Sequence, residues 1–426
     1  MTDVATANQP EIPAAGAWAA KARALDRYRW LLLRERHGLL GSGLRFAREA
    51  LRDWLFGLGA RARLARSYAS EPCDFLLLQS APKIIAMQRK KLLIEGLRRD
   101  HSLLETALLE LADIVRQRLL QRPPQRVPLR YFGYAAHAEW LVARYEPKVL
   151  LNDRNGSLYA PFLRLSLNVR RKLLVQLAHA TTAESSRRLG MNDYDYYFLF
   201  GQSSLEALQA RALRFGTSQV VLAGSHMIDR AFDLAPADPA MRTLLVLGVG
   251  PDKEKEAGYQ RTYAILRDWA KQNPEYQVLI KAHPRSRVPF WNETAVALAN
   301  VRVLPATSGL AEALEQASLV VNIMSNAVIE AALSRRPVLY VNASEDPDIF
   351  AQERFLGACI SSREALQQAV IRVEQDREQA IRQGTLFAEY HLAHGCGGLA
   401  WSTQALSLLL ESNDPPGVKL TSTIEQ

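Results

Sequence analysis

Short apolar runs and helical patterns alternate along most of the chain. Residues 73–79, 148–152, 243–250 and 319–324 are almost continuously apolar, which is typical of strands covered on both faces. The stretches between such runs carry apolar residues three and four positions apart, which predicts helices. Strands that alternate with helices in this way indicate parallel sheets, so we predict an α/β fold.

The alternation stops at a segment rich in proline and alanine, residues 233–242, and then starts again. A chain of 426 residues is long enough for two domains and a smaller element. We therefore predict two doubly wound, Rossmann-like domains that follow a helical extension. The expected segments are a basic amphipathic extension at 1–70, an N-terminal domain at 71–235, a C-terminal domain at 236–390, and a C-terminal helix and tail at 391–426.

The first domain contains two elements whose patterns are less regular. Residues 102–120 predict a long helix that ends before the proline pair at 123–124. Residues 127–134, VPLRYFGY, predict a strand because they are rich in aromatic residues. We therefore expect a helix and then a strand between the first and the next buried strand.

Positive charge is concentrated near the N-terminus. Residues 20–70 contain twelve Lys/Arg and four Asp/Glu, a net charge of +8, while the whole chain carries +9. Charge confined to one segment argues against a nucleic-acid-binding protein, whose basic residues spread over a folded face. The segment combines an apolar helical stripe with arginines beside it: Leu44, Ala47, Leu51, Leu55 and Leu58 form the stripe, and Arg45, Arg48 and Arg52 lie off it.

Two interpretations of this stripe stay open. In the first, the helix lies on an anionic membrane surface with its apolar face in the lipid interface. In the second, the stripe packs on the body of the protein and the arginines are merely solvated. A basic amphipathic helix is compatible with both.

The remaining composition indicates a cytoplasmic protein, peripheral on the inner face of the membrane if the first interpretation holds. The three cysteines are scattered and lack metal-ligand spacing, which favours a reducing compartment without structural zinc. The opening residues have neither the basic start nor the apolar stretch of a secretory signal. No apolar run reaches the length of about 18 residues that a membrane span requires.

Candidate chemistry gathers where the strands of the second domain end. Lys281, His283 and Arg285 follow the apolar run 278–280 within five positions. Ligands of open α/β sheets bind beyond the carboxyl ends of the strands, so these basic groups predict an anion site there. Gly248 and Gly250 end the preceding strand and would let the backbone approach a ligand closely, although a plain turn explains them equally well.

A third strand of this domain ends at Ser325 and Asn326, which open a helical pattern. Both residue types are favoured N-caps, and a helix N-terminus attracts anions. Glu330 lies in the second turn of the expected helix, where its carboxylate could accept hydrogen bonds from the two hydroxyls of a ribose. An anion site beside a diol acceptor predicts a nucleotide pocket.

These motifs carry a family resemblance. KAHPRSR at 281–287, followed by SNAVIEAALSRRPVLY at 325–340, resembles the nucleotide-sugar half of GT-B glycosyltransferases. More narrowly, it is similar to bacterial capsule and surface-polysaccharide transferases, including the Kdo- and sialic-acid-type enzymes with an HP motif. The resemblance implies that His283, Pro284, Ser325 and Asn326 bind the phosphate of a nucleotide donor, often a CMP-sugar.

The first domain resembles the acceptor-side half of the same family over VLLNDRNGSLYAPFL at 149–163 and the stretch from Val175 to Leu208. His179 and Ala180 match the family's Gln-His-Ala element, but Ala178 stands where a glutamine is usual. Asp153 ends a strand and could serve as the base that deprotonates an acceptor or as the carboxylate that traps the glycosyl centre. A turn aspartate and a core histidine are the structural alternatives for Asp153 and His179.

No metal or cofactor is expected beyond the nucleotide-sugar substrate. The Asp-Tyr-Asp at 193–195 resembles the metal-binding motif of a different transferase class, but it stands at the start of a strand, away from the expected ligand edge. In the GT-B family, basic groups usually stabilise the departing phosphate, and the resemblance gives this role to Lys281, His283 and Arg285.

We therefore predict a glycosyltransferase that moves a sugar, such as Kdo or another nonulosonic acid from a CMP donor, onto a surface polysaccharide or lipid-linked glycan. Three alternatives stay open: an isomerase like UDP-GlcNAc 2-epimerase, a CDP-glycerol glycerophosphotransferase, and an inactive binding module of a polysaccharide assembly complex. The epimerases resemble SGGxxEE at the serine site, whereas this chain has SNAVIEA with one glutamate.

Overall fold

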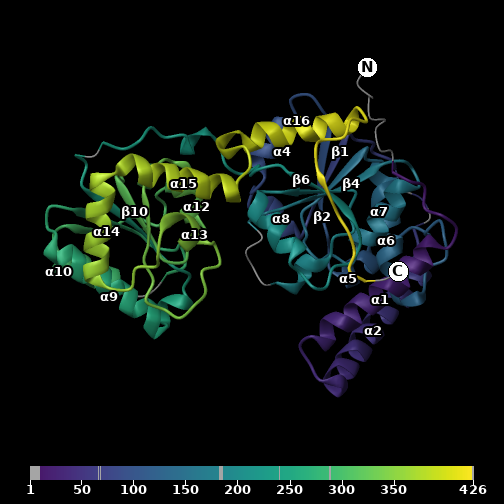
Figure 1. Cartoon of the computed structure of the whole chain (residues 1–426). Coiled ribbons are helices and arrows are strands. Elements are labelled where there is room, and N and C mark those ends of the chain that lie inside the picture. The colour runs from purple at the N-terminus through teal and green to yellow at the C-terminus, as the bar shows by residue number, and fades with distance from the viewer. Residues whose placement is uncertain are drawn as a thin grey trace. The chain divides into compact units, whose positions relative to one another are not determined.

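The computed structural model describes residues 10–65, 67, 69–181, 186–238, 240–286 and 289–424, with the side chain of Arg187 outside the description. The chain forms two compact α/β units (Figure 1). The first unit comprises Met1–Met227 together with Gly398–Gln426, and the second comprises Ile228–Gly397. Each unit is described by itself below.

The described residues of the first unit form a seven-stranded sheet in the order β12-β6-β5-β4-β3-β1-β2. All neighbouring strands run parallel except β12, which pairs antiparallel with β6 at one edge. The strands are β1 (Phe75–Gln79), β2 (Leu103–Ala107), β3 (Val149–Asn152), β4 (Leu173–Leu177), β5 (Tyr196–Leu199), β6 (Ser218–Leu222) and β12 (Val418–Leu420). The carboxyl ends of β1 to β6 therefore share one edge of the sheet.

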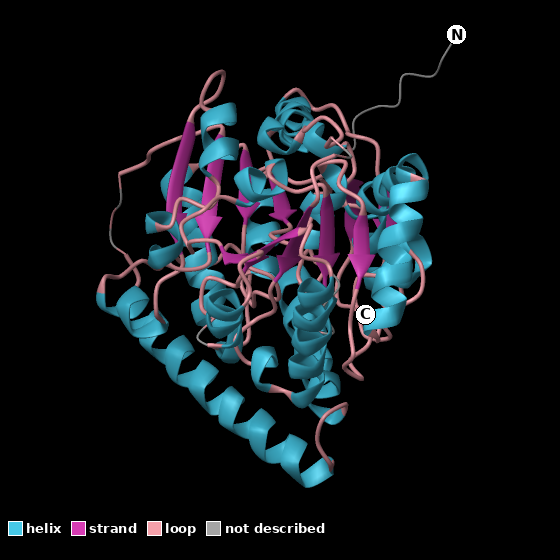
Figure 2. Cartoon of the chain, turned by 90° about the vertical axis from the view of Figure 1, so that its left-hand side faces the viewer, coloured by secondary structure: helices cyan, strands magenta, loops and turns pink. Residues whose placement is uncertain are grey.

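Helices border the strands, as Figure 2 shows in cyan and magenta. Strands β1, β3, β4 and β5 are almost completely buried, as strands covered on both faces must be. The helices of the first unit are α1 (Ala17–Arg34), α2 (Leu39–Ala62), α3 (Pro82–Ala86), α4 (Lys91–Leu97), α5 (Leu111–Arg116), α6 (Leu129–Tyr145), α7 (Ala160–Asn168), η1 (Arg187–Gly190), α8 (Gln202–Gln209) and α16 (Gly398–Leu410).

The second unit has a five-stranded sheet in the order β11-β10-β7-β8-β9 within the described residues, and every pair is parallel. Its strands are β7 (Thr243–Leu247), β8 (Gln277–Lys281), β9 (Val301–Val303), β10 (Leu319–Asn322) and β11 (Val338–Tyr340). Its helices are η2 (Arg230–Phe232), η3 (Lys253–Lys255), α9 (Ala257–Gln272), α10 (Phe290–Ala297), α11 (Leu310–Glu315), α12 (Ala327–Leu333), α13 (Gln352–Leu356), α14 (Arg363–Gln375), α15 (Arg377–His391) and η4 (Gly395–Gly397). The predicted pair of doubly wound, Rossmann-like folds preceded by helices is confirmed.

Two predicted elements of the first unit are wrong. Residues 102–120 do not form one helix, because Leu103–Ala107 pair in parallel with β1 as the edge strand β2 and only Leu111–Arg116 are helical. Residues 127–134 are not a strand, because α6 begins at Leu129 and continues to Tyr145. In both places packing against neighbouring elements outweighs local preference.

The division of the chain differs from the expected boundaries at both crossings between the units. Residues 228–235 belong to the second unit, where Arg335 pairs with Asp233 at 2.8 Å and Arg336 donates to the carbonyl of Ala235 at 2.7 Å. Residues 398–426 return to the first unit. There Ser402 donates to the carbonyl of Ala223 at 3.0 Å, and β12 extends the sheet.

The N-terminal extension forms a hairpin of α1 and α2 that projects from the body of the first unit (Figure 1). The interpretation in which the leucine stripe packs on the body is wrong, because the stripe residues of α2 are exposed. Among the described residues, no helix is both long and apolar enough to cross a membrane.

Candidate functional site

Three parallel strands of the second unit bring the predicted nucleotide residues to one edge. β7 lies between β8 and β10, so the residues that follow these strands are neighbours. Gly248 donates its N–H to the carbonyl of Lys281 at 3.0 Å. A Cβ at Gly248 would lie 3.1 Å from the backbone nitrogen of His283, so a larger residue would press on the loop that carries the histidine. The absence of a side chain at Gly248 therefore lets this loop approach β7 closely.

The ring of His283 is oriented by its own loop. The backbone N–H of Arg285 donates to Nδ1 of His283 at 3.1 Å. A ring nitrogen that accepts a hydrogen bond carries no proton, so the proton of the neutral imidazole lies on Nε2. His283 is partly exposed and can present this Nε2–H as a donor to a bound oxygen anion.

The basic cluster formed by Lys281, His283 and Arg285 has no acidic partner among the described residues. Lys281 is the last residue of β8, and Arg285 is exposed beside Pro284. Elsewhere in this unit, exposed cations such as Lys253 and Arg335 are paired with carboxylates. Basic groups left without counter-charges at a strand end form a suitable anion site.

The loop between β10 and α12 is held by buried Asn322. Its side-chain amide donates to Gln352 at 2.7 Å, and its Oδ1 accepts the backbone N–H of Ser325 at 3.1 Å. The hydroxyl of Ser325 accepts the N–H of Ala327 at 3.3 Å, while Asn326 occupies the N-cap position without a side-chain cap bond. The two residues therefore open the helix as expected, with Asn326 at the N-cap position and the hydroxyl of Ser325 accepting the hydrogen bond.

Glu330 lies in the first turn of α12 rather than in the second, because the helix begins only at Ala327. Burial raises the pKa of its carboxyl group from 4.5 to about 7. No cation pairs with it in the described part of the chain. A desolvated carboxyl group without a cationic partner gains stability from a ligand that donates hydrogen bonds to it.

A charged cluster that the sequence analysis did not single out joins the loops after β7 and β11. Asp346 accepts hydrogen bonds from Lys253 and from the hydroxyl of Tyr259, each at 2.6 Å. Gly258 packs on Ser344, and a Cβ at that glycine would lie 2.6 Å from the serine Cα. These contacts fix two further loops at the carboxyl edge of the sheet.

The first unit holds a second constellation, centred on Asp153 directly after β3. Its carboxylate pairs with Lys90 at 2.8 Å, and the same ammonium lies 3.1 Å from Nε2 of His226. All three residues are buried, with Lys90 only 2% exposed. Lys90 thus connects the end of β3 with the residue that follows β6.

The electrostatics of this constellation favour a neutral imidazole. Burial, together with the charges of Lys90 and His179, lowers the pKa of His226 well below its ordinary value of 6.5. Lys90 has no acceptor lone pair, so it donates to Nε2 of His226, and the ring proton lies on Nδ1. His179 follows β4 and is exposed, close enough to influence His226.

A buried amide network orients the loop that carries Asp153. Asn152 donates to the side chain of Gln176 at 2.5 Å, and Gln176 donates to Asn155 at 3.0 Å. Gly156 closes the turn with a φ of 65°, and a Cβ there would lie 2.6 Å from the Cβ of Arg188. The NDRNG segment is therefore a turn, as its composition suggests, and the same turn places Asp153 beside Lys90.

The Asp-Tyr-Asp motif has a structural role in this fold. Asp193 pairs with Lys21 at 3.0 Å and with Arg164 at 2.9 Å, and Arg164 also pairs with Asp195 at 2.9 Å. Although burial alone would raise it, the charges of Lys21 and Arg164 lower the pKa of Asp193 below its ordinary value. Among the residues described, no three or more His, Cys, Asp or Glu side chains gather as a metal site.

Sequence reasoning missed Lys90 and His226. Lys90 stands in the basic run QRKK, where nothing distinguishes a buried lysine from its exposed neighbours. His226 follows a buried strand at the carboxyl edge, and that position was the available signal. The parallel order of β3, β4, β5 and β6 brings His226 to the edge where Asp153 lies, whereas Lys90 comes from the segment before α4.

Solved structures agree with the two-unit architecture. No family model and no curated protein matches the chain. A provisionally named UDP-N-acetylglucosamine 2-epimerase from Listeria monocytogenes has a TM-score of 0.54 at 12% identity, and the alignment covers 81% of this chain and 98% of that one. Another UDP-N-acetylglucosamine 2-epimerase has a TM-score of 0.50 at 12% identity, covering 83% of this chain and 100% of that one. The predicted GT-B fold is thereby confirmed, and identities this low carry the fold alone.

Proposed function

We propose that the protein is a glycosyltransferase that takes its sugar from a nucleotide donor. The preferred donor is a CMP-activated nonulosonic acid such as Kdo, and the acceptor is a growing surface polysaccharide or lipid-linked glycan. The reaction would belong to capsule or lipopolysaccharide synthesis at the inner face of the cytoplasmic membrane. The nature of the sugar and of the acceptor rests on the family resemblance of the HP motif and the later serine segment.

The basic cluster after β8 carries this proposal. Lys281 and Arg285 place positive groups at a strand end without described acidic partners, and His283 between them presents an Nε2–H donor. In this scheme they bind the donor phosphate and balance the charge that develops as the phosphate leaves the sugar. Ser325, held by Asn322, adds a hydroxyl on the adjacent loop.

Glu330 supports the nucleoside part of the proposal. A ribose has two vicinal hydroxyls, and a carboxylate can accept hydrogen bonds from both. The raised pKa of Glu330 is caused by burial, which leaves this group poorly solvated by the protein and by water. Two hydroxyl donors would replace the lost solvation and would lower that pKa on binding.

We assign proton removal to Asp153 in the first unit. An acceptor hydroxyl attacks the anomeric carbon, the bond to the donor phosphate breaks, and the hydroxyl proton passes to the Asp153 carboxylate. The ion pair with Lys90 holds this carboxylate in one place, and the residue keeps 8% exposure. To His179, which is exposed after β4, we assign contact with a substrate hydroxyl.

An isomerase is the rival that the fold leaves open, since the two structures compared above bear the name UDP-N-acetylglucosamine 2-epimerase. The chain offers a single glutamate, Glu330, after the serine site, which is a departure from the epimerase pattern. Incubation with UDP-GlcNAc separates the two, because appearance of UDP-ManNAc would establish the isomerase and refute the transferase.

The direct test is a nucleotide titration by calorimetry on the full chain. His283→Ala should weaken binding of the preferred nucleotide at least about tenfold, because a charge-assisted hydrogen bond contributes about 1.5–3 kcal/mol. Arg372→Ala removes an exposed arginine of α14 in the same unit and serves as the control, with affinity unchanged. Equal affinities for the His283 variant and the original protein would refute the assignment of the phosphate site.

A further inference from the structure

The hairpin of α1 and α2 exposes a row of large apolar side chains. On α2, Leu44 is 76% exposed and Leu51, Leu55 and Leu58 are more than half exposed. Leu40, at the start of the same helix, is 89% exposed. These residues recur at spacings of three, four and seven, so they lie along one face of the helix. Large exposed apolar patches on a folded protein mark surfaces that contact something else.

The opposite face of α2 binds the body of the first unit through small and polar residues and one aromatic residue, Phe56. Its buried residues are Ser42, Ala50, Asp53, Phe56, Gly57 and Ala60. Buried Asp53 pairs with Arg29 at 2.7 Å and accepts the hydroxyl of Tyr134 at 2.8 Å. The orientation of α2 is therefore fixed by specific contacts, and the leucine face points outward as a consequence of them.

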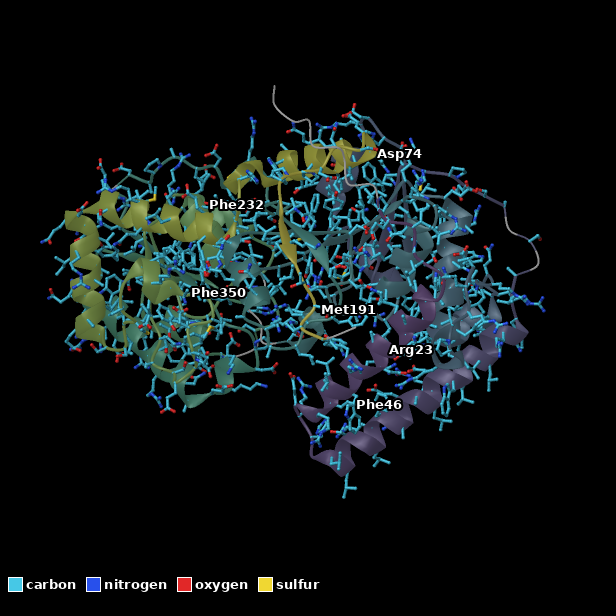
Figure 3. All side chains as sticks on the ribbon, turned by 45° about the vertical axis from the view of Figure 1, so that its right-hand side comes forward. Arg23, Phe46, Asp74, Met191, Phe232 and Phe350 are labelled. Carbon is cyan, nitrogen blue, oxygen red and sulfur yellow. The ribbon has the colours of Figure 1, made fainter. Side chains whose placement is uncertain are left out.

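Arginines flank the leucine face, and among the described residues only Arg52 has an acidic partner, the buried Asp53 at 3.8 Å. Arg45, Arg48 and Arg52 are exposed and lie on α2 at spacings of three and four. Both carboxylates of α2 bind Arg29 more closely than any of these arginines, since Glu49 and buried Asp53 each lie 2.7 Å from the Arg29 guanidinium. In Figure 3, where Arg23 and Phe46 mark the two helices, the hairpin extends beyond the body of its unit. The outer face of α2 is thus apolar along its middle and positive beside it.

We propose that this face of α2 docks on a lipid bilayer that contains anionic lipids. Leu44, Leu51 and Leu55 would enter the boundary between headgroups and acyl chains, to a depth of about 5–10 Å. The arginines beside them would contact the lipid phosphates. At about 1.5 Å per residue, the 24 residues of α2 form a contact line about 36 Å long.

A second copy of the chain is a poorer partner for this surface. Two leucine faces in contact would bring Arg45, Arg48 and Arg52 of both copies together, and α2 offers no free carboxylate to separate them. Like charges in such proximity oppose association. An anionic bilayer satisfies the apolar face and the arginines at once.

The test is co-sedimentation of the full chain with phosphatidylcholine vesicles, with and without phosphatidylglycerol. We expect binding only when phosphatidylglycerol is present, and release as salt rises to about 1 M, where charges are screened beyond about 3 Å. Leu44→Ser, Leu51→Ser and Leu55→Ser combined should weaken vesicle binding at least about tenfold, because each removes apolar surface from the contact. Arg45→Glu, Arg48→Glu and Arg52→Glu combined should abolish it.

Matched controls change equivalent residues of the second unit. Arg302→Glu, Arg372→Glu and Arg382→Glu combined make the same change in net charge, and Leu386→Ser removes a leucine that is 56% exposed. Both controls should bind vesicles like the original protein, and every variant should keep the original thermal unfolding temperature. A second readout is Trp54, 50% exposed on α2, whose loss in Trp54→Phe should remove the blue shift in fluorescence that vesicles produce.

Three results would overturn the proposal: no vesicle binding by the original protein, undiminished binding by the leucine variant, or equal loss in the charge control. Self-association that the leucine substitutions abolish, without vesicle binding, would instead identify a second copy as the partner. The inference is independent of the proposed reaction. Nucleotide affinity measured without lipid should be the same in all hairpin variants, so the failure of one proposal leaves the other standing.

Discussion

Replacing Lys90 with methionine tests the constellation around Asp153 most sharply. Lys90→Met keeps the approximate length of the side chain and removes its charge. It leaves the Asp153 carboxylate, only 8% exposed, without its partner at 2.8 Å. Breaking a buried ion pair by removing one member costs about 3–5 kcal/mol, because the remaining charge stays desolvated. For a unit of this size, we expect the unfolding temperature to fall by at least about 6 °C.

The assay is thermal unfolding followed by intrinsic fluorescence, with Lys91→Met as the control. Lys91 is the adjacent residue, but its side chain is 62% exposed and it forms only an i,i+4 pair with Glu95 at 3.8 Å. Exposed pairs of this kind contribute at most about 0.5 kcal/mol, so the control should unfold like the original protein. Both substitutions replace a lysine with methionine at adjacent positions, so they differ only in the surroundings of the lysine.

The double variant Lys90→Met with Asp153→Asn shows whether Lys90→Met lowers stability by leaving an unpaired charge or by disturbing side-chain packing. Once both charges are removed, no unpaired ion remains, and we expect more than half of the lost stability to return. An unfolding temperature for Lys90→Met within about 1 °C of the original would refute the buried pair. A double variant no more stable than the single one would assign the effect to packing instead.

Two further predictions concern the nucleotide side. Burial raises the pKa of Glu330 from 4.5 to about 7, so the folded state holds this proton more tightly than the unfolded state. Its contribution to stability is therefore present below pH 4.5 and is lost as pH rises through about 7, so the unfolding temperature should fall over this range. In Glu330→Gln this fall should be absent. An identical pH profile of the unfolding temperature in the variant would contradict the assignment. Separately, CMP should raise the unfolding temperature more than UDP at equal concentration, and stabilisation by UDP alone would replace the CMP donor with a UDP-sugar.

The repeat of apolar runs and helices was sufficient to predict both sheets, because strands buried on two faces are almost fully apolar. It failed at β2, where residues 103–107 are only partly buried at the sheet edge and LETALLEL also fits a helix. It failed again at α6, whose aromatic residues favour a strand locally. There Gly133 permits contact with Phe56 of α2, and this packing is invisible to a reading of neighbouring residues.

Some residues of the candidate site could likewise be predicted from the sequence, and others could not. Lys281 ends a strand, and His283 and Ser325 follow strands within a few positions, so their placement at one edge follows from the parallel order alone. Lys90 could not be found in this way, because it precedes α4 and reaches Asp153 only through the folded arrangement of the first unit. Residues that follow parallel strands can be predicted from the chain, whereas partners supplied by other elements require the structure.

Helix α2 shows why a periodic pattern identifies a face without telling whether that face is inside. The leucine stripe suggests a core-facing helix, yet the helix packs on α6 with small residues and Phe56. A Cβ at Gly57 would overlap the carbonyl oxygen of Leu129, so the two backbones are too close for leucine side chains between them. Buried Asp53 then fixes the rotation of α2, because its pair with Arg29 and its bond to Tyr134 would be lost if the helix turned. The close approach of the two backbones and the buried charge of Asp53 both exclude the leucines from the interface between α2 and α6. The exposure of the leucines therefore follows from how α2 is attached to the first unit, and this attachment makes the outer face of α2 available to a membrane.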